Sequence, residues 1–131
     1  MIYNFVQYIV NNFSLITFTA DGFMPNSADD AISIIDNGGT VDHYTGRSDI
    51  NVQFLSRSKN KVTARQNIQS IFDFIKNRFG VTLPEATVNG ETYPSVKAYA
   101  IVPIQAPGYI GADETNYEMY SFNVTVTFDY S

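Results

Sequence analysis

The last stretch of the chain, from Tyr120 to Tyr130, alternates without a break between large apolar and small polar side chains. Successive side chains of a strand point to opposite faces, so this alternation predicts a long strand with one apolar face. The side chains expected on that face are Tyr120, Phe122, Val124, Val126, Phe128 and Tyr130. An apolar face of this size has to be covered by other parts of the chain.

Two segments with helical spacing are the candidates for this cover. The first helix is expected over residues 2–13, with Ile2, Phe5, Val6, Ile9, Val10 and Phe13 inward and Asn4, Gln7, Asn11 and Asn12 outward. The second is expected over residues 60–79, with Val62, Ile68, Ile71, Phe72, Ile75 and Phe79 inward and Arg65, Gln69, Asp73 and Lys76 outward. Gly80 stands where such a helix is expected to stop.

Shorter apolar or alternating runs predict the remaining strands. They cover residues 15–19, 28–36, 49–57 and 93–105, with a short edge piece at 81–88 that Pro84 interrupts. Turns are expected at Asn37-Gly38-Gly39 and at Asn89-Gly90, and a loop is expected over residues 107–117.

This order of elements predicts an α+β fold, a mainly antiparallel β-sheet with two amphipathic helices packed on one face. We expect residues 1–131 to form a single domain. No helix is left for the opposite face of the sheet. That face is therefore expected to meet solvent, a lumen or another subunit.

Composition excludes several classes of protein. A net charge of −5 argues against a protein that binds nucleic-acid phosphates. Because the chain has no cysteine, disulfides, thiolate catalysis and Cys-type zinc sites are excluded. The start of the chain has no basic region typical of a signal peptide, and no apolar run is long enough to span a membrane. Charged residues make up only 16% of the chain, which suits a surface covered by neighbours or a monomer with a neutral coat.

Candidate chemistry is sparse. His43 beside Asp42 is a conceivable base but has no nucleophile motif with it, and a loop histidine is the favoured interpretation. Asp29-Asp30, and Asp113-Glu114 with Glu118, lack the spacing of a calcium loop and are interpreted as solvated acids. We therefore expect no catalytic residue, no cofactor and no metal site.

Two segments carry a resemblance to a known family. Asp49-Ile50-Asn51-Val52-Gln53-Phe54-Leu55-Ser56-Arg57 leads into a helix near Lys61, and Ala106-Pro107-Gly108-Tyr109-Ile110-Gly111-Ala112-Asp113-Glu114 leads into the strand from Tyr120. Together they resemble the minor capsid and tail terminator proteins of long-tailed bacteriophages. The resemblance covers about residues 45–130. It implies an α+β subunit of a structural ring, and it supplies no catalytic residues.

The resemblance also implies binding partners and a location in the virion. Such proteins form a hexameric ring that caps the head-proximal end of the tail tube and joins it to head-completion proteins. DNA would only pass through the lumen, no membrane would be involved, and the protein would be made in the host cytoplasm and end at the head–tail junction of the virion. By position, contacts are expected from Arg57, Lys59, Lys61, Arg65, Tyr109, Ile110, Asp113, Glu114 and Tyr117.

Several alternatives stay open at the level of sequence. The chain is compatible with another ring-forming head–tail connector, a tail tube protein or another minor capsid protein. A small hydrolase that uses His43 or paired acids, and a monomeric ligand-binding domain, are further alternatives from other classes.

Overall fold

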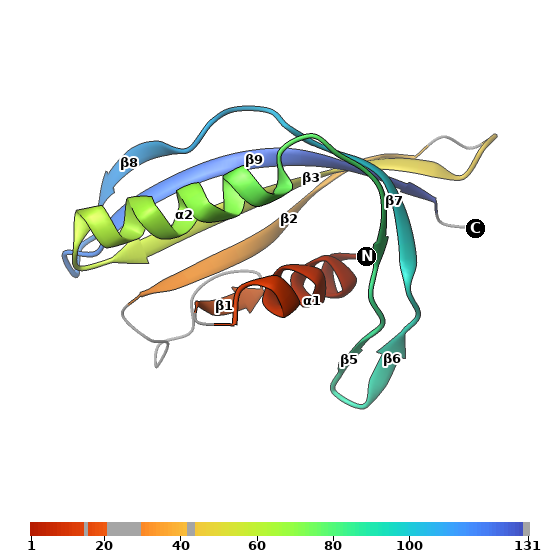
Figure 1. The fold of residues 1–131 in the computed structure, drawn as a ribbon, viewed down its shortest axis with the longest axis horizontal. Helices are drawn as coiled ribbons and strands as arrows, with labels where there is room; N and C mark the ends of the chain where they lie inside the picture. Colours follow the sequence, from red (N-terminus) through yellow and green to blue (C-terminus); the bar gives the residue numbers. More distant parts are fainter. Residues whose placement is uncertain (15, 21–29, 42–43, 130–131) are drawn as a thin grey trace.

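The computed structural model describes residues 1–14, 16–20, 30–41 and 44–129 (Figure 1). Its main sheet is curled and has the order β1-β2-β3-β9-β7-β4, with β8 pairing β9. The helices are α1 (Ile2–Asn12) and α2 (Lys61–Ile75). The strands of the main sheet are β1 (Thr17–Ala20), β2 (Ala31–Val41), β3 (Arg47–Ser58), β4 (Arg78–Leu83), β7 (Val96–Pro103), β8 (Gly108–Ala112) and β9 (Glu118–Asp129). A separate pair of strands is formed by β5 (Ala86–Val88) and β6 (Glu91–Tyr93). The predicted α+β class is confirmed; β1 pairs β2 in parallel, and the other pairings are antiparallel.

The centre of the sheet is the antiparallel pair β3 and β9, which run alongside each other for their whole length. The alternation that predicted β9 is confirmed. Its inward side chains are buried: Tyr120, Phe122, Val124, Val126 and Phe128. Tyr130, the last member of the predicted face, lies outside the described residues.

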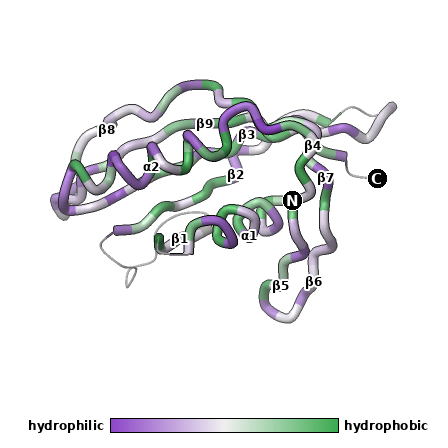
Figure 2. The backbone as a smooth tube through the Cα atoms, viewed as in Figure 1, coloured by the Kyte–Doolittle hydropathy of each residue, from purple (hydrophilic) through white to green (hydrophobic). Residues whose placement is uncertain are grey.

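Both helices cover this same face of the sheet, as predicted. Phe54 of β3 and Phe122 of β9 stack with ring centroids 4.7 Å apart. Phe5 of α1 packs on Phe54 at 5.8 Å, and Phe72 of α2 packs on Phe122 at 5.4 Å. Hydrophobic positions recur along these elements in Figure 2. The two central aromatic rings therefore join both helices to one core.

The opposite face of β3 and β9 is polar. Asn51 and Thr125 face each other there, and the Thr125 hydroxyl donates a hydrogen bond to Oδ1 of Asn51 at 3.2 Å. One pair further along, Thr127 donates in the same way to Asp49. Asp49 and Asn51 are exposed, so this part of the sheet is left open by the helices.

The prediction of a turn at Asn37-Gly38-Gly39 is wrong. β2 continues through these residues with a bulge, and the register against β3 shifts between Asp36 and Gly39. The carboxylate of Asp36 accepts the N–H of Gly38 at 2.8 Å, and Gly38 has the positive φ of +76° that suits glycine. The chain thus reverses later, after Val41. Residues 28 and 29 of the predicted strand lie outside the described residues.

The second helix is shorter than predicted. It ends at Ile75, and Asn77 with φ of +53° leads directly into β4. Gly80 lies within β4 and is not the helix stop. Phe79, expected on the buried helix face, pairs with Ala100 of β7 and is 67% exposed. Val62, in the first turn of α2, is also exposed, at 61%.

The predicted orientation of Asn4 in the first helix is wrong. It was expected to face outward, but its side chain is buried and is 1% exposed. Its Nδ2 donates to the carbonyl oxygens of Pro84, Tyr93 and Pro94 at 3.0, 3.1 and 3.0 Å. These carbonyls lie at the two ends of the β5–β6 hairpin, where Pro84 and Pro94 fall outside the paired residues and Tyr93 is the last residue of β6. A polar side chain in an apolar stripe thus binds backbone carbonyls at the base of the hairpin.

The remaining strand predictions agree in outline. β1 begins at Thr17 rather than at residue 15, which lies outside the described residues. β4 is a sheet edge and β5 follows Pro84, as the interrupted run at 81–88 indicated. The run at 93–105 contains β7, in which Ala98 and Ile101 are buried. The turn at Asn89-Gly90 joins β5 to β6.

Candidate functional site

The junction between β3 and α2 is held by a network of local hydrogen bonds. The side-chain oxygen of Asn60 caps the helix by accepting the N–H groups of Val62 at 3.0 Å and Thr63 at 3.3 Å. The Ser58 hydroxyl accepts the N–H of Asn60 at 3.0 Å and donates to the carboxylate of Asp30. These hydrogen bonds therefore order the backbone to which the cationic residues Lys59 and Lys61 belong.

The segment predicted as a loop over residues 107–117 contains a strand, so this prediction is wrong in part. Residues 108–112 form β8, which pairs with the start of β9. The loop pattern hid the strand because β8 is short, contains two glycines and has a bulge between Tyr109 and Gly111. Gly111 has a φ of +109°. Ile110 lies in that bulge and is 56% exposed.

Tyr109 is fixed from two sides. Its ring lies 5.3 Å from the ring of Tyr120, its partner on β9. Its hydroxyl donates to the carboxylate of Glu118 at 2.6 Å, and this hydrogen bond raises the pKa of Tyr109. The ring is nevertheless 46% exposed. The side chain is thus an ordered aromatic surface at the edge of the sheet.

The turn between β8 and β9 is organised by Asp113. Its carboxylate accepts the N–H groups of Thr115 at 2.9 Å and Tyr117 at 3.0 Å, and the Thr115 hydroxyl at 2.8 Å. These hydrogen bonds, first of all that from Tyr117, hold the pKa of Asp113 below its ordinary value. Asn116 completes the turn with φ of +65°. Asp113 therefore has a local structural role, and both Asp113 and its neighbour Glu114 are exposed.

The junction and the β8–β9 turn meet in space. The Lys61 ammonium lies 4.0 Å from the ring centroid of Tyr109. The Arg57 guanidinium lies 4.5 Å from the ring centroid of Tyr117, and the Lys59 ammonium lies 5.6 Å from the same ring. A cation over the face of an aromatic ring is attracted by the ring's negative face. The two segments selected from the sequence as contact candidates thus form one continuous region at one end of the sheet.

The part of this region that faces outward is amphipathic. We call it the α2–β8 surface and define it by Lys61, Val62, Arg65, Tyr109 and Ile110. Val62, Tyr109 and Ile110 are large hydrophobic side chains with substantial exposure. Lys61 and Arg65 are exposed and make no ion pair with any residue in the described ranges. Exposed apolar side chains beside unpaired cations are typical of a surface that contacts another protein.

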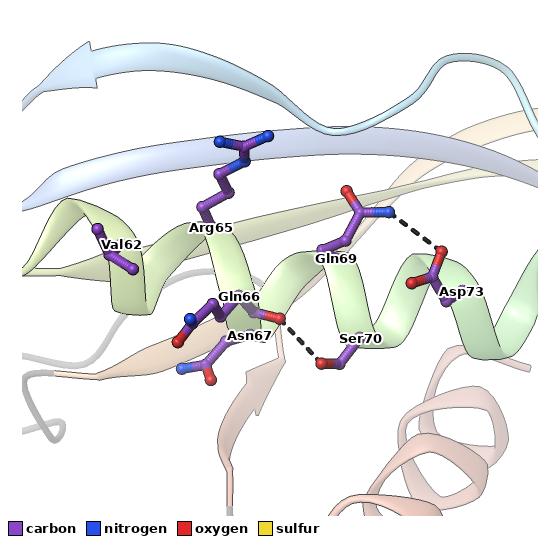
Figure 3. Close-up of a pocket in the computed structure, with 7 residues that line it drawn as sticks. All are labelled: Val62, Arg65, Gln66, Asn67, Gln69, Ser70 and Asp73. Carbon is purple, nitrogen blue, oxygen red and sulfur yellow. Dashed lines mark hydrogen bonds between the residues drawn. The ribbon is translucent and has the colours of Figure 1, made fainter.

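A groove continues the surface along α2 (Figure 3). It has a volume of about 730 Å³ and is lined by Val62, Arg65, Gln66, Asn67, Gln69, Ser70 and Asp73. Gln69 donates to Asp73 at 3.1 Å, and Ser70 donates to the carbonyl of Gln66 at 2.9 Å. All of these side chains come from one helix, so the groove is open along its length.

The candidate chemical groups lie only partly within the described residues. His43 and Asp42 lie outside the described residues, as does Asp29. Asp30 accepts a hydrogen bond from Ser58. Across the described ranges no three His, Cys, Asp or Glu side chains gather in a way that would hold a metal ion. Neither α1 nor α2 is long and apolar enough to cross a membrane.

Comparison with known families decides the assignment of the chain. Residues 10–130 match the family model of the bacteriophage tail terminator protein. The chain belongs to this family. A tail terminator is a structural protein of the phage tail, so this protein is associated with the virion. No curated protein matches the chain.

Two structural features of this tail terminator were not predicted from its sequence. Val62 was assigned to the core because it fits the helical spacing, but α2 begins at the end of the sheet, where its first turn has little to pack on. The second feature is the hairpin of β5 and β6, whose turn was predicted but whose separation from the main sheet was not. The two prolines that bracket it, Pro84 and Pro94, were its signal in the sequence.

Proposed function

We propose that this tail terminator forms a hexameric ring that caps the head-proximal end of the tail tube. The ring stops the growth of the tube and offers a surface to the head-completion proteins. The observation that carries the proposal is the family match over residues 10–130. In this proposal residues 1–131 act as one structural domain without catalytic activity, and the protein is made in the host cytoplasm before it joins the virion.

The α2–β8 surface supports a role in contacts between subunits or with the tube. It combines exposed apolar side chains, cations without an acidic partner, and a backbone held by the Asn60 cap and the Asp113 turn. A preordered surface loses less conformational entropy when it binds. Among the nine contact candidates, we assign direct contacts to Lys61, Arg65, Tyr109 and Ile110. We assign supporting positions to the other five, which are Arg57, Lys59, Asp113, Glu114 and Tyr117.

The polar face of the sheet suits a channel through which DNA passes. Between Arg47 and Arg57, at the two ends of β3, the residues Asp49, Asn51, Thr125 and Thr127 present uncharged or acidic groups, and the chain as a whole carries a net charge of −5. Lasting attachment to DNA requires clustered lysine and arginine. We place this face toward the lumen of the ring.

Tail length in the absence of the protein tests the proposed function. A phage with this gene deleted is grown with and without a plasmid that supplies the protein, and tails are measured by electron microscopy. We expect tubes of irregular, extended length and no joining to heads without the plasmid. Tubes of normal, uniform length in the absence of the protein would contradict the assignment as terminator.

Imaging of labelled particles separates the terminator from related ring proteins. A label attached to the protein is expected once per virion, at the head–tail junction. A label repeated along the tail would indicate a tube subunit. The family match favours the single position.

A further inference from the structure

The hairpin of β5 and β6 projects from the body of the protein. It forms a two-stranded sheet of its own, which leaves the main sheet after β4 and returns at β7. In Figure 1 it extends away from the rest of the fold. Asn89 and Gly90 both have positive φ, +52° and +80°, which gives the tight turn that matches the twist of the two strands. We call residues 84–95 the β5–β6 arm.

The arm is rigidly attached at its base. The buried Asn4 binds the carbonyls of Pro84, Tyr93 and Pro94, and the ring of Tyr3 lies 5.1 Å from the ring of Tyr93. α1 therefore contacts both ends of the hairpin. An isolated hairpin of this length is marginally stable in water, so this attachment fixes its direction.

The arm is acidic. It carries Glu85 and Glu91, both exposed, and residues 84–95 contain no lysine, arginine or histidine. Glu91 accepts a hydrogen bond from the Tyr93 hydroxyl at 3.1 Å. This contact holds the carboxylate in place without neutralising its charge.

The acidic arm and the cationic α2–β8 surface lie far apart on the molecule. Figure 1 shows the start of α2 and β8 at the left end, and the hairpin projecting at the bottom, on the other side of α1. They cannot meet within one chain. Two different, complementary surfaces on one subunit are the requirement for a head-to-tail contact that closes into a ring.

We infer that the β5–β6 arm of one copy docks on the α2–β8 surface of the next copy. Glu85 and Glu91 face Lys61 and Arg65, which are one helical turn apart, and the arm covers Val62 and Ile110. This inference rests on the ring proposed above. It adds to that proposal the identity of the two surfaces that join neighbouring subunits.

Disulfide trapping tests the contact, because the chain has no native cysteine to interfere. A full-length chain carrying both Lys61→Cys and Glu91→Cys is supplied to the deletion phage, and purified particles are oxidised and run on a non-reducing gel. Disulfide formation requires Cα atoms within about 7 Å of each other. We expect a ladder of cross-linked oligomers that ends at the size of the ring.

The matched control moves one cysteine along the same helix. Gln69→Cys with Glu91→Cys places the thiol about 12 Å further along α2, since a helix rises about 1.5 Å per residue. This pair is expected to cross-link poorly. Equal cross-linking of both pairs, products that stop at the dimer, or cross-links only to the tube protein would overturn the inference.

Charge reversal supplies an independent test. Lys61→Glu with Arg65→Glu, and separately Glu85→Lys with Glu91→Lys, are each expected to weaken self-association about tenfold or more, because like charges then face each other. A mixture of the two variants is expected to assemble again, because each arm then finds an opposite charge on the other variant. Assembly of either variant alone at the native level, or no recovery in the mixture of variants shown to fold by circular dichroism, would overturn the inference.

The two proposals fail in different ways. Uniform tails without the protein would remove the terminator function and leave the cross-link between copies intact. Absence of the cross-link in particles whose tail length still depends on the protein would remove the contact and leave the function intact.

Discussion

Asn4 shows how one side chain connects distant parts of this protein. Its amide group binds carbonyls that are separated from it by about eighty to ninety positions in the sequence. Those carbonyls belong to Pro84, to Pro94 and to Tyr93, which precedes Pro94 at the end of the hairpin ladder. Burial of a polar group is costly unless all its bonds are formed, so Asn4 fits only if the arm is in place.

Replacement of Asn4 by alanine is expected to destabilise the protein by about 1–3 kcal/mol, because three partly buried hydrogen bonds to backbone carbonyls are lost. The free energy of unfolding is measured by urea denaturation. Asn11→Ala is the matched control, since Asn11 is an exposed asparagine of the same helix that accepts one hydrogen bond from Gln7. Equal effects of the two substitutions would show that the Asn4 contacts add nothing.

Asp113 gives the β8–β9 turn a dependence on pH. Its folded-state pKa lies below its ordinary value of 3.8, so its charged form is favoured by folding. The resulting stabilisation is present above pH 3.8 and is lost as the pH falls through the folded-state pKa. We expect wild-type protein to lose more stability than Asp113→Asn between pH 5 and about pH 2.

Thermal unfolding of both proteins across this range measures the difference. Glu114→Gln serves as the control because Glu114 is the neighbouring acid. Parallel stability curves for the wild type and Asp113→Asn would contradict the proposed role of the hydrogen bonds.

At the scale of elements, the bulge in β2 depends on a close approach of two backbones. A Cβ atom built on Gly39 would lie 1.8 Å from the carbonyl oxygen of Asp49 on β3. Backbone cannot move aside as a flexible side chain can. Only glycine therefore allows β2 to regain its pairing with β3 after the bulge.

Gly39→Ala is expected to destabilise the protein by about 1–3 kcal/mol or more, the usual cost of overpacking. Gly108→Ala is the control, because its Cβ would meet nothing within 4 Å. Hydrogen exchange of the β2 amides should rise in the first variant and stay unchanged in the second. Native protection of β2 in Gly39→Ala would disprove the steric argument.

At the scale of the whole molecule, charge is distributed unevenly. The net charge is −5, yet unpaired cations gather on the α2–β8 surface and acids on the β5–β6 arm. An interaction between exposed charges weakens with added salt, because the screening length falls from about 10 Å at 0.1 M to about 3 Å at 1 M. The contact inferred above should share this dependence.

Self-association is therefore expected to weaken as salt rises from about 0.05 to 0.5 M. Analytical ultracentrifugation in the presence of tail tubes, which separates bound oligomer from free monomer, measures it. A variant with Glu85→Gln and Glu91→Gln should associate more weakly and respond less to salt. A native salt response in that variant would show that other charges govern association.

Sequence periodicity was sufficient for the elements that form the core. β9, β3 and both helices were predicted because the spacing of their apolar residues reports directly on which face is buried. The loop–strand segment around Tyr109 and the strand–helix segment around Arg57 also carried the resemblance that the family match confirmed. The selection of these two segments as contact sites remains a prediction.

Only the tertiary structure decided how these pieces relate. It brought Lys61 onto Tyr109 and Arg57 onto Tyr117, buried Asn4, and left Val62 and Phe79 exposed. A local pattern records the preference of each residue for water or for a core. It cannot record where an element ends relative to its neighbours, and this position determines which apolar residues are covered and which cations remain without a partner.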